Sequence, residues 1–233
     1  MTTVAFDLLG TLFDLEPLRS RLQEAGLQDG PLELWFAQSL RDYFAVSHSG
    51  AYVPLAAMLE ASLVRMLRVR GLGEKEVIPD VMEAFSSLPP TRGAQDAVEA
   101  LAAAGVRLLA VTNGSRSLAQ SLLARAGFDR SFTSVLSCDD IGVSKPHPRV
   151  YERAKQLADA DPWLVAAHAW DVAGAMRAGL KGAWVSSAEG VYPTMLQPPD
   201  VRADDVAEAA RLILGAAAGP TEVTGGGGER PRR

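Results

Sequence analysis

The sequence lacks the features that mark disulfide-rich, membrane-spanning or nucleic-acid-binding proteins. Among its 233 residues is one cysteine, Cys138, which excludes an internal disulfide and a metal site built from several thiolates. No apolar run reaches the roughly 18–20 residues that cross a bilayer. The N-terminus has no basic region and places Asp7 where a signal peptide is apolar. There is no long basic run and the net charge is -5, so neither nucleic acid nor a membrane is expected as a partner, and we expect a cytoplasmic protein.

The sequence does contain the composition of a folded globular protein. Hydrophobic residues make up 48% and charged residues 22%. The length suits one α/β domain with a smaller insertion and is too short for two full-sized domains.

Hydrophobic periodicity divides the chain into two kinds of segment. Residues 4–9 are a short apolar run closed by Gly10-Thr11, which predicts a buried strand. Residues 17–85 carry apolar side chains at helical spacing and predict about four helices. Beyond residue 93 the pattern alternates: it predicts helices at 94–104, 118–126, 148–158, 172–178 and 201–214, and strands at 106–112, 132–137, 164–167 and 183–186.

Apolar strands alternating with helices predict a parallel sheet that is covered on both faces. The predicted fold class is therefore α/β: a Rossmann-like core of residues 1–15 and 88–220 with an inserted helical cap of residues 16–87. Because the insertion follows the first strand, we expect the cap over the carboxyl ends of the strands. Residues 221–233 are polar and glycine-rich and predict a flexible tail.

Polar residues follow four successive strands of the predicted sheet, and ligands of parallel α/β sheets bind at that edge. The residues are Asp7 and Thr11, Thr112 and Asn113, Lys145, and His168 and Asp171. Each residue also has a purely structural interpretation. Asp7 and the Thr112-Asn113-Gly114 segment are typical of turns, Lys145 of a solvated surface, and Asp171 of the N-cap of the helix at 172–178. Their shared position at strand ends favours an active site.

At these residues the chain resembles the haloacid dehalogenase superfamily. Phe6-Asp7-Leu8-Leu9-Gly10-Thr11-Leu12 is similar to its first motif, whose leading aspartate is the nucleophile. Thr112-Asn113-Gly114 resembles the second motif, Lys145-Pro146 the third, and Trp170-Asp171-Val172 the fourth.

Two departures separate the chain from the magnesium phosphatases of that superfamily. Leu9 stands where those enzymes have the general-acid aspartate, and Ala167 stands where they have a metal-binding aspartate. The 2-haloacid dehalogenase branch also lacks both carboxylates, and it is similar in Ala169-Trp170-Asp171 and in Tyr151.

The resemblance implies a hydrolase that displaces halide from short 2-haloacids, with no metal and no cofactor. Asp7 would attack carbon and form an ester, Lys145 would keep it ionised, and Asp171 would position the hydrolytic water. The predicted substrate-binding residues are Leu8, Leu9, Thr11, Phe36, Thr112, Asn113, Tyr151 and His168. The resemblance also makes a homodimer reasonable.

Three departures from the dehalogenase branch concern the halide and its surroundings. Phe36 stands where the branch has an arginine that cradles the halide, and Arg41 lies about 140° further round the helix. The branch's tyrosine two residues after the nucleophile is Leu9 here, and its serine and asparagine in the fourth motif are Ala166 and His168. A protonated imidazole at residue 168 or the indole N–H of Trp35 could replace the arginine; the alternatives are a halide pocket altered for a smaller leaving group such as fluoride, or a weak enzyme.

Two alternatives stay open at this point. One is a superfamily phosphatase whose acid and metal groups are displaced, with Asp139 or Asp140 supplying ligands. The other is a binding protein that kept the fold and lost turnover.

Overall fold

The computed structural model describes residues 2–217, and within them the chain forms a six-stranded sheet. The strands are β1 (Thr3–Phe6), β2 (Arg107–Thr112), β3 (Phe132–Ser137), β4 (Pro162–Ala166), β5 (Lys181–Val185) and β6 (Val201–Ala203). Their order across the sheet is β3-β2-β1-β4-β5-β6, and every neighbouring pair is parallel. The first strand is buried along its whole length, as expected of a strand covered on both faces. The predicted α/β class and Rossmann-like parallel sheet are confirmed.

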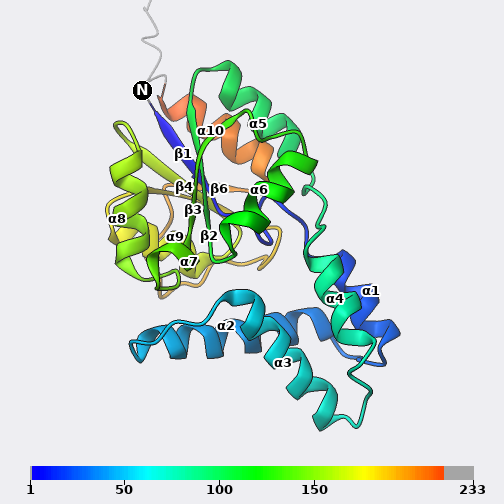
Figure 1. The fold of residues 1–233 in the computed structure, drawn as a ribbon. Helices are drawn as coiled ribbons and strands as arrows, with labels where there is room; N and C mark the ends of the chain where they lie inside the picture. The colour runs from blue at the N-terminus through cyan, green and yellow to red at the C-terminus, as the bar shows by residue number, and fades with distance from the viewer. Residues whose placement is uncertain (1, 218–233) are drawn as a thin grey trace, which may run out of the picture.

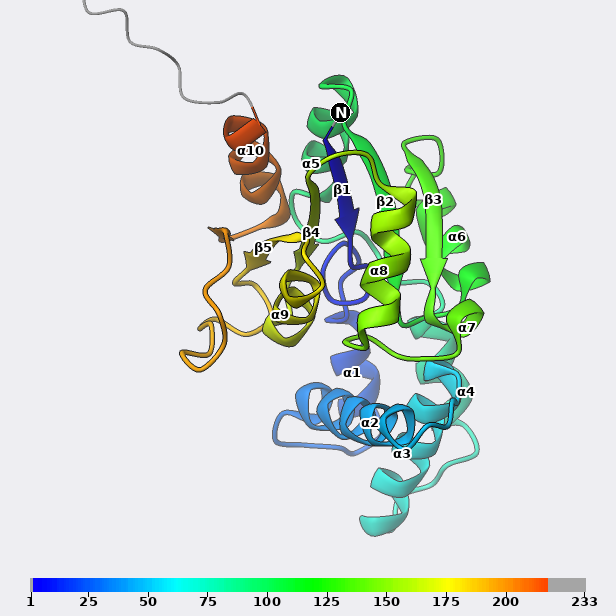
Figure 2. The same ribbon diagram turned by 90° about the vertical axis from the view of Figure 1, so that its left-hand side faces the viewer.

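Helices cover both faces of the sheet (Figures 1 and 2). One face packs against α5 (Ala94–Ala103), α6 (Arg116–Arg125) and α10 (Val206–Ala217). The other packs against α8 (Pro148–Leu157) and α9 (Ala169–Arg177), with the short α7 (Cys138–Ile141) at the end of β3. The carboxyl ends of the strands are left uncovered by these helices.

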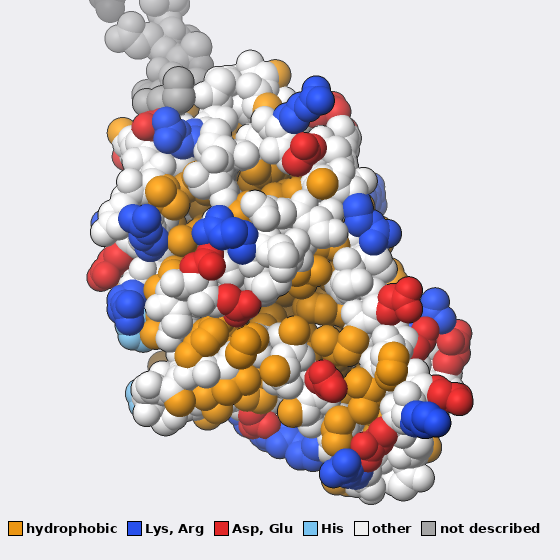
Figure 3. All heavy atoms as spheres, in the orientation of Figure 1, with side chains coloured by type: hydrophobic (Ala, Val, Ile, Leu, Met, Phe, Trp, Pro, Cys, Tyr) orange, Lys and Arg blue, Asp and Glu red, His pale blue; other side chains and the backbone are white. Residues whose placement is uncertain are grey.

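Four further helices lie over those carboxyl ends as a separate layer (Figure 1). They are α1 (Pro17–Glu24), α2 (Pro31–His48), α3 (Leu55–Val69) and α4 (Val77–Phe85), and the predicted helical cap is confirmed. Hydrophobic side chains gather along the junction between this layer and the sheet (Figure 3). The predicted boundaries of the cap at residues 16 and 87 stay a prediction, and the predicted tail at 221–233 lies outside the described residues.

The chain leaves the core for the cap and returns to it at adjacent points. Asp14 N donates to Pro89 O at 2.8 Å, and Thr91 N donates to Leu12 O at 2.9 Å. The Thr91 hydroxyl donates to Thr11 O at 2.8 Å. These bonds fix the base of the cap beside the loop that follows β1.

The prediction of one closing helix from residue 201 is wrong. Val201–Ala203 is the edge strand β6, paired with β5, and the helix begins at Val206. Side-chain capping bonds mark the break: the Asp205 carboxylate accepts from Glu208 N at 2.8 Å, and the Glu208 carboxylate accepts from Asp204 N at 2.9 Å.

The helix α9 begins three residues earlier than the sequence pattern indicated. Its N-cap residue is His168, so Asp171 lies in the first helical turn and is not an N-cap. This position turns the carboxylate inward instead of toward the helix N-terminus. Among the described residues, no helix is long and apolar enough to cross a membrane.

Candidate active site

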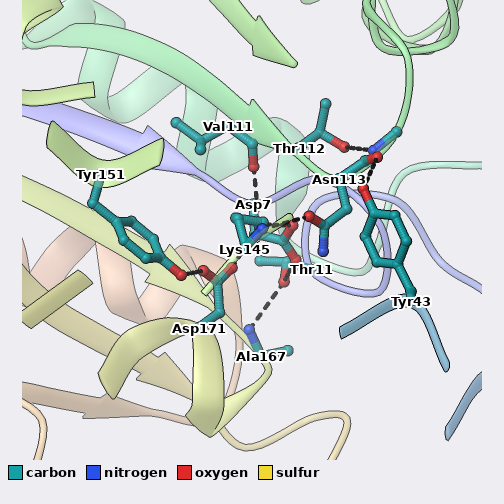
Figure 4. A network of polar contacts seen from close by, with 11 residues as sticks. Asp7, Thr11, Tyr43, Val111, Thr112, Asn113, Lys145, Tyr151, Ala167 and Asp171 are labelled. Carbon is teal, nitrogen blue, oxygen red and sulfur yellow. Dashed lines mark hydrogen bonds and ion pairs between the residues drawn. The ribbon is translucent and has the colours of Figure 1, made fainter. Parts of the chain in front are cut away.

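Residues from three strand ends and one loop meet at the edge of the sheet beneath the cap (Figure 4). Asp7 directly follows β1, Asn113 follows β2, and Asp171 lies in the helix after β4. Lys145 comes from the loop between α7 and α8. Because β1 and β4 are neighbours, the two carboxylates approach the lysine from adjacent strands.

The Lys145 ammonium is the centre of the site. Its Nζ donates to Asp7 Oδ1 at 2.7 Å, to Asp171 Oδ2 at 2.6 Å and to Val111 O at 3.0 Å. Burial by itself lowers the pKa of this lysine, but the charges of Asp171 and Asp7 outweigh burial and raise it above its ordinary value. All three N–H donors are used, and the side chain stays a cation.

Asp171 is held from both sides. Lys145 donates to one oxygen, and the Tyr151 hydroxyl donates to the other, Oδ1, at 2.6 Å. Burial raises the pKa of this carboxyl group above its ordinary value, while the lysine charge opposes the rise. Burial and the Asp171 charge also raise the pKa of Tyr151, so the phenol stays a proton donor.

The carboxylate of Asp7 is oriented by its own loop. Oδ2 accepts from Thr11 Oγ1 at 2.7 Å, and this hydroxyl accepts in turn from Ala167 N at 2.9 Å. Leu8 O accepts from three successive backbone N–H groups, those of residues 11, 12 and 13, which closes a tight loop. Gly10 has φ +81° within it, a conformation that favours glycine. The loop therefore fixes the carboxylate before any substrate arrives.

Several hydrogen-bond donors around Asp7 have no acceptor within the described part of the chain. They are the backbone N–H groups of Leu8, Leu9 and Asn113 and the side-chain amide of Asn113. The amide oxygen of that asparagine accepts from Lys145 N at 2.9 Å, which orients the side chain. These donors suit an anionic group placed beside the carboxylate.

A cavity of about 10 Å³ lies beside Asp7, which is room for one water molecule. It is lined by Leu9, Phe36, Leu40, Leu55, Asn113, His168 and Trp170. The ring centroids of Phe36 and His168 are 5.8 Å apart, and both residues also line a cavity of about 770 Å³ that lies between cap and core. The two rings thus belong to the wall between the larger cavity and the carboxylate.

Comparison with known proteins decides the family. Residues 1–179 match the family described as haloacid dehalogenase-like hydrolase. This chain belongs to that family.

Named relatives of this haloacid dehalogenase-like hydrolase agree with the match. The (S)-2-haloacid dehalogenase of Pseudomonas sp. (strain YL) is 31% identical over 84% of this chain and 88% of the relative. Haloacetate dehalogenase H-2 of Moraxella sp. (strain B) is 24% identical over 84% of this chain and 91% of the relative. The solved L-2-haloacid dehalogenase of Xanthobacter autotrophicus superposes with a TM-score of 0.80 at 24% identity, covering 91% and 98% of the two chains, and so shares the fold.

The structure divides the predicted substrate-binding residues of this haloacid dehalogenase-like hydrolase into two groups. Leu9, Phe36, Asn113 and His168 line the small cavity. The others support the site from behind: Leu8 is buried in the core, Thr112 Oγ1 accepts from Gly114 N at 2.9 Å, and Thr11 and Tyr151 donate to the two carboxylates. Their direct contact with substrate stays a prediction.

Some lining residues were missed from the sequence. Leu40 lies one helical turn after Phe36, so helical spacing would have found it. Leu55 comes from the next helix and carries no local signal. Trp170 was recognised only as part of a motif; its ring faces His168 with centroids 5.6 Å apart.

The two groups suggested as substitutes for the halide-binding arginine of the dehalogenase branch lie in different places. The Trp35 indole N–H donates to Leu59 O at 3.0 Å within the cap, so it does not reach the site. Arg41 is exposed and paired with Asp42, as its place on the helix predicted. His168 is the one of the two suggested groups that lines the cavity.

The carboxylates considered for a phosphatase site of this haloacid dehalogenase-like hydrolase have other partners. Asp139 accepts from the Tyr52 hydroxyl, and Asp140 pairs with Arg116 at 2.6 Å. Across residues 2–217, no group of three or more His, Cys, Asp or Glu side chains has a geometry that holds a metal ion.

Gly174 lets α9 approach the lysine loop closely enough to present Asp171. A Cβ atom at this position would lie 2.7 Å from Pro146 Cβ and 2.9 Å from Tyr151 Oη. We expect Gly174→Ala to lower the free energy of unfolding by about 2 kcal/mol through overpacking, measured by urea denaturation.

Gly215 in α10 supplies the matched control for this substitution, because a Cβ there meets nothing within 4 Å. Gly215→Ala is expected to leave stability unchanged or raise it by up to about 1 kcal/mol, since alanine favours helices. Equal stability of the two variants would contradict the close approach.

Proposed function

We propose that this chain is a 2-haloacid dehalogenase that displaces halide from short 2-haloacids without a metal ion. The observation that carries the proposal is the ion cluster in which one buried lysine binds both Asp7 and Asp171. It supplies an oriented carboxylate that is paired with a buried cation next to a cavity, while Leu9 and Ala167 offer neither the acid nor the ligand of a magnesium phosphatase.

In the first step Asp7 acts as the nucleophile. A carboxylate oxygen attacks the carbon that bears the halogen, the carbon–halogen bond breaks, and the halide leaves with the bonding electrons. An aspartyl ester remains on the enzyme. Halide departs as an anion and needs no proton, which agrees with Leu9 in the place of a general acid.

In the second step water attacks the Cγ carbonyl of the ester and releases a 2-hydroxyacid. One water proton passes to Asp171, whose pKa is raised by burial and which is thereby suited to accept it. When the ester C–O bond breaks, Asp171 returns this proton to the departing alkoxide, which leaves as the alcohol, and the second water proton is released from the re-formed Asp7 carboxyl group. The attacking oxygen ends in the regenerated Asp7 carboxylate, and the original carboxylate oxygen leaves with the product. Lys145 keeps its bond to Asp171 while the nucleophile is esterified and uncharged.

The substrate carboxylate is assigned to the unused donors beside the nucleophile. Three backbone N–H groups, those of Leu8, Leu9 and Asn113, would bind it together with the asparagine side-chain amide. These donors are uncharged, so the lysine charge stays committed to the nucleophile.

The halide is assigned to the aromatic wall formed by Phe36, His168 and Trp170. Ring edges and the imidazole and indole N–H groups are the positive features of this wall. The wall leaves little volume beside Asp7, so the smallest 2-haloacids are the expected substrates.

The proposal is tested by halide release from chloro-, bromo- and fluoroacetate and from both enantiomers of 2-chloropropionate, with a chelator present. We expect release from haloacetates and from (S)-2-chloropropionate, and no effect of the chelator. A single turnover in ¹⁸O-water should place the label in the peptide that contains Asp7 and leave the product unlabelled.

Strict magnesium dependence, or hydrolysis of p-nitrophenyl phosphate with no halide release, would overturn the proposal. The homodimer and the cytoplasmic location stay predictions for the same chain.

A further inference from the structure

Two tyrosines of the cap reach core loops that carry the site. Tyr43 of α2 is buried, and its hydroxyl donates to Asn113 O at 3.4 Å. Tyr52, in the loop between α2 and α3, donates to Asp139 Oδ1 at the start of α7. The two hydroxyl oxygens lie 3.2 Å apart, and the rings meet edge to face with centroids 6.2 Å apart.

A third polar contact joins the same end of α2 to the lysine loop. Ser144 N donates to Ser47 Oγ at 3.1 Å. The next residue, Lys145, donates its backbone N–H to the Asn113 side chain at 2.9 Å. The carboxyl end of α2 and the loop that follows it are therefore bonded to the loop after β2, to the start of α7 and to the loop that carries Lys145.

The opposite side of the cap is attached through the chain itself, at Asp14 and Pro89. The helix α2 extends across the cap away from α1 and α4 (Figure 1), and it carries Phe36 and Leu40 beside the carboxylate of Asp7. The position of these two side chains is consequently fixed by covalent attachment at one end and by hydrogen bonds at the other.

Both phenols are proton donors over the ordinary pH range. Burial raises the pKa of Tyr43, and burial together with the bond to Asp139 raises the pKa of Tyr52. Neither side chain lines the cavity at Asp7, so their role differs from that of the lining residues.

We propose that Tyr43 and Tyr52, together with Asp139, which accepts from Tyr52, and Ser47, which accepts from Ser144 N, are positioning residues that hold α2 against the Asn113 and Lys145 loops. This inference rests on the proposed function, because it assigns them to the closed site in which Asp7 reacts. Substrate access requires the cavity to enlarge, and α2 moves away from the core only when this contact is broken.

The decisive variant is Tyr52→Phe, which removes one hydroxyl and keeps the ring. We expect KM to rise and kcat/KM to fall about tenfold, which corresponds to about 1.4 kcal/mol and matches one hydrogen bond to a charged acceptor. The value of kcat should stay within about twofold, because bound substrate restores the closed cap. A structural role alone would lower kcat through the unfolded fraction and leave KM unchanged.

Asp139 supplies the partner variants. The loss of kcat/KM in Asp139→Ala should equal the loss in Tyr52→Phe. The double variant should lose no more kcat/KM than either single variant, because both substitutions remove the same bond. Asp139→Asn keeps an acceptor and should restore most of the loss. Additive losses in the double variant would overturn the assignment of this bond.

Tyr192→Phe is the matched control, since its hydroxyl donates to Gln197 O at 2.9 Å, away from the cap. Amide hydrogen exchange gives a readout that needs no turnover: exchange of residues 43–54 should be about tenfold faster in Tyr52→Phe than in the control. If the wild type releases no halide, the proposed function fails while the exchange still decides the inference. Identical exchange in Tyr52→Phe and Tyr192→Phe would overturn it.

Discussion

Replacing Asp7 by asparagine is expected to abolish halide release, with a loss of at least about 10³-fold, because the nucleophile of the first step is removed. The fold should persist. An asparagine oxygen still accepts from Lys145, which also keeps its bonds to Asp171 and to Val111 O. The measurement is halide release from haloacetates alongside urea denaturation of the same preparation.

Two further variants sharpen this result. Asp7→Ala guards against slow deamidation of the introduced asparagine, which would restore the aspartate and its activity. Asp14→Asn is the control, because Asp14 lies at the same rim but accepts only from Glu16 N among the described contacts. Turnover by Asp7→Ala within tenfold of the wild type would exclude the ester mechanism.

Replacing Lys145 by methionine is expected to cause the largest loss of stability, about 3–5 kcal/mol at neutral pH, because two buried carboxylates lose their cation. The loss should depend on pH. Without the lysine charge the pKa of Asp171 rises further above its unfolded value, so the folded variant binds a proton that the unfolded chain releases. Stability of the variant therefore falls as pH rises from about 4 through the folded pKa.

Urea denaturation between pH 5 and pH 8 checks the sign of this effect. The difference between wild type and Lys145→Met should be larger at pH 8 than at pH 5. The raised pKa of Lys145 in the wild type adds no pH dependence in this window, since its stabilisation is fully present there and is lost only above about pH 10.4. Lys155→Met, which removes an exposed lysine that donates to Ala178 O, should show a small difference that is independent of pH.

Most of the fold followed from local patterns. The strands β1 to β5 are short apolar runs, and the four cap helices have long amphipathic repeats, so periodicity found both. It missed β6 because Val201–Ala203 joins the apolar pattern of the next helix without a glycine or proline between them. Only the side-chain capping bonds of Asp205 and Glu208 separate the two elements, and such bonds are weak signals in a sequence.

The site could be predicted as far as its residues lie at strand ends. Asp7 and Asn113 follow strand ends directly, Asp171 lies in the helix after β4, and Lys145 comes from the longer connection after β3; the edge of a parallel sheet brings such positions together. Tyr43 and Tyr52 could not be found in this way, since their partners lie 70 and 87 residues away on other elements. The packing of a cap on a core is a tertiary property without a local period.

Because hydrogen bonds join Asp14 to Pro89 and Thr91 to Leu12, the cap is an insertion whose two ends lie side by side in the core. The register of the sheet therefore does not depend on the sequence or length of the inserted cap. A longer insertion raises the free-energy cost of closing the loop only logarithmically with its length. The segment between these anchors can thus be exchanged in evolution while Asp7 and Lys145, which lie outside it, keep their places and their ion pair.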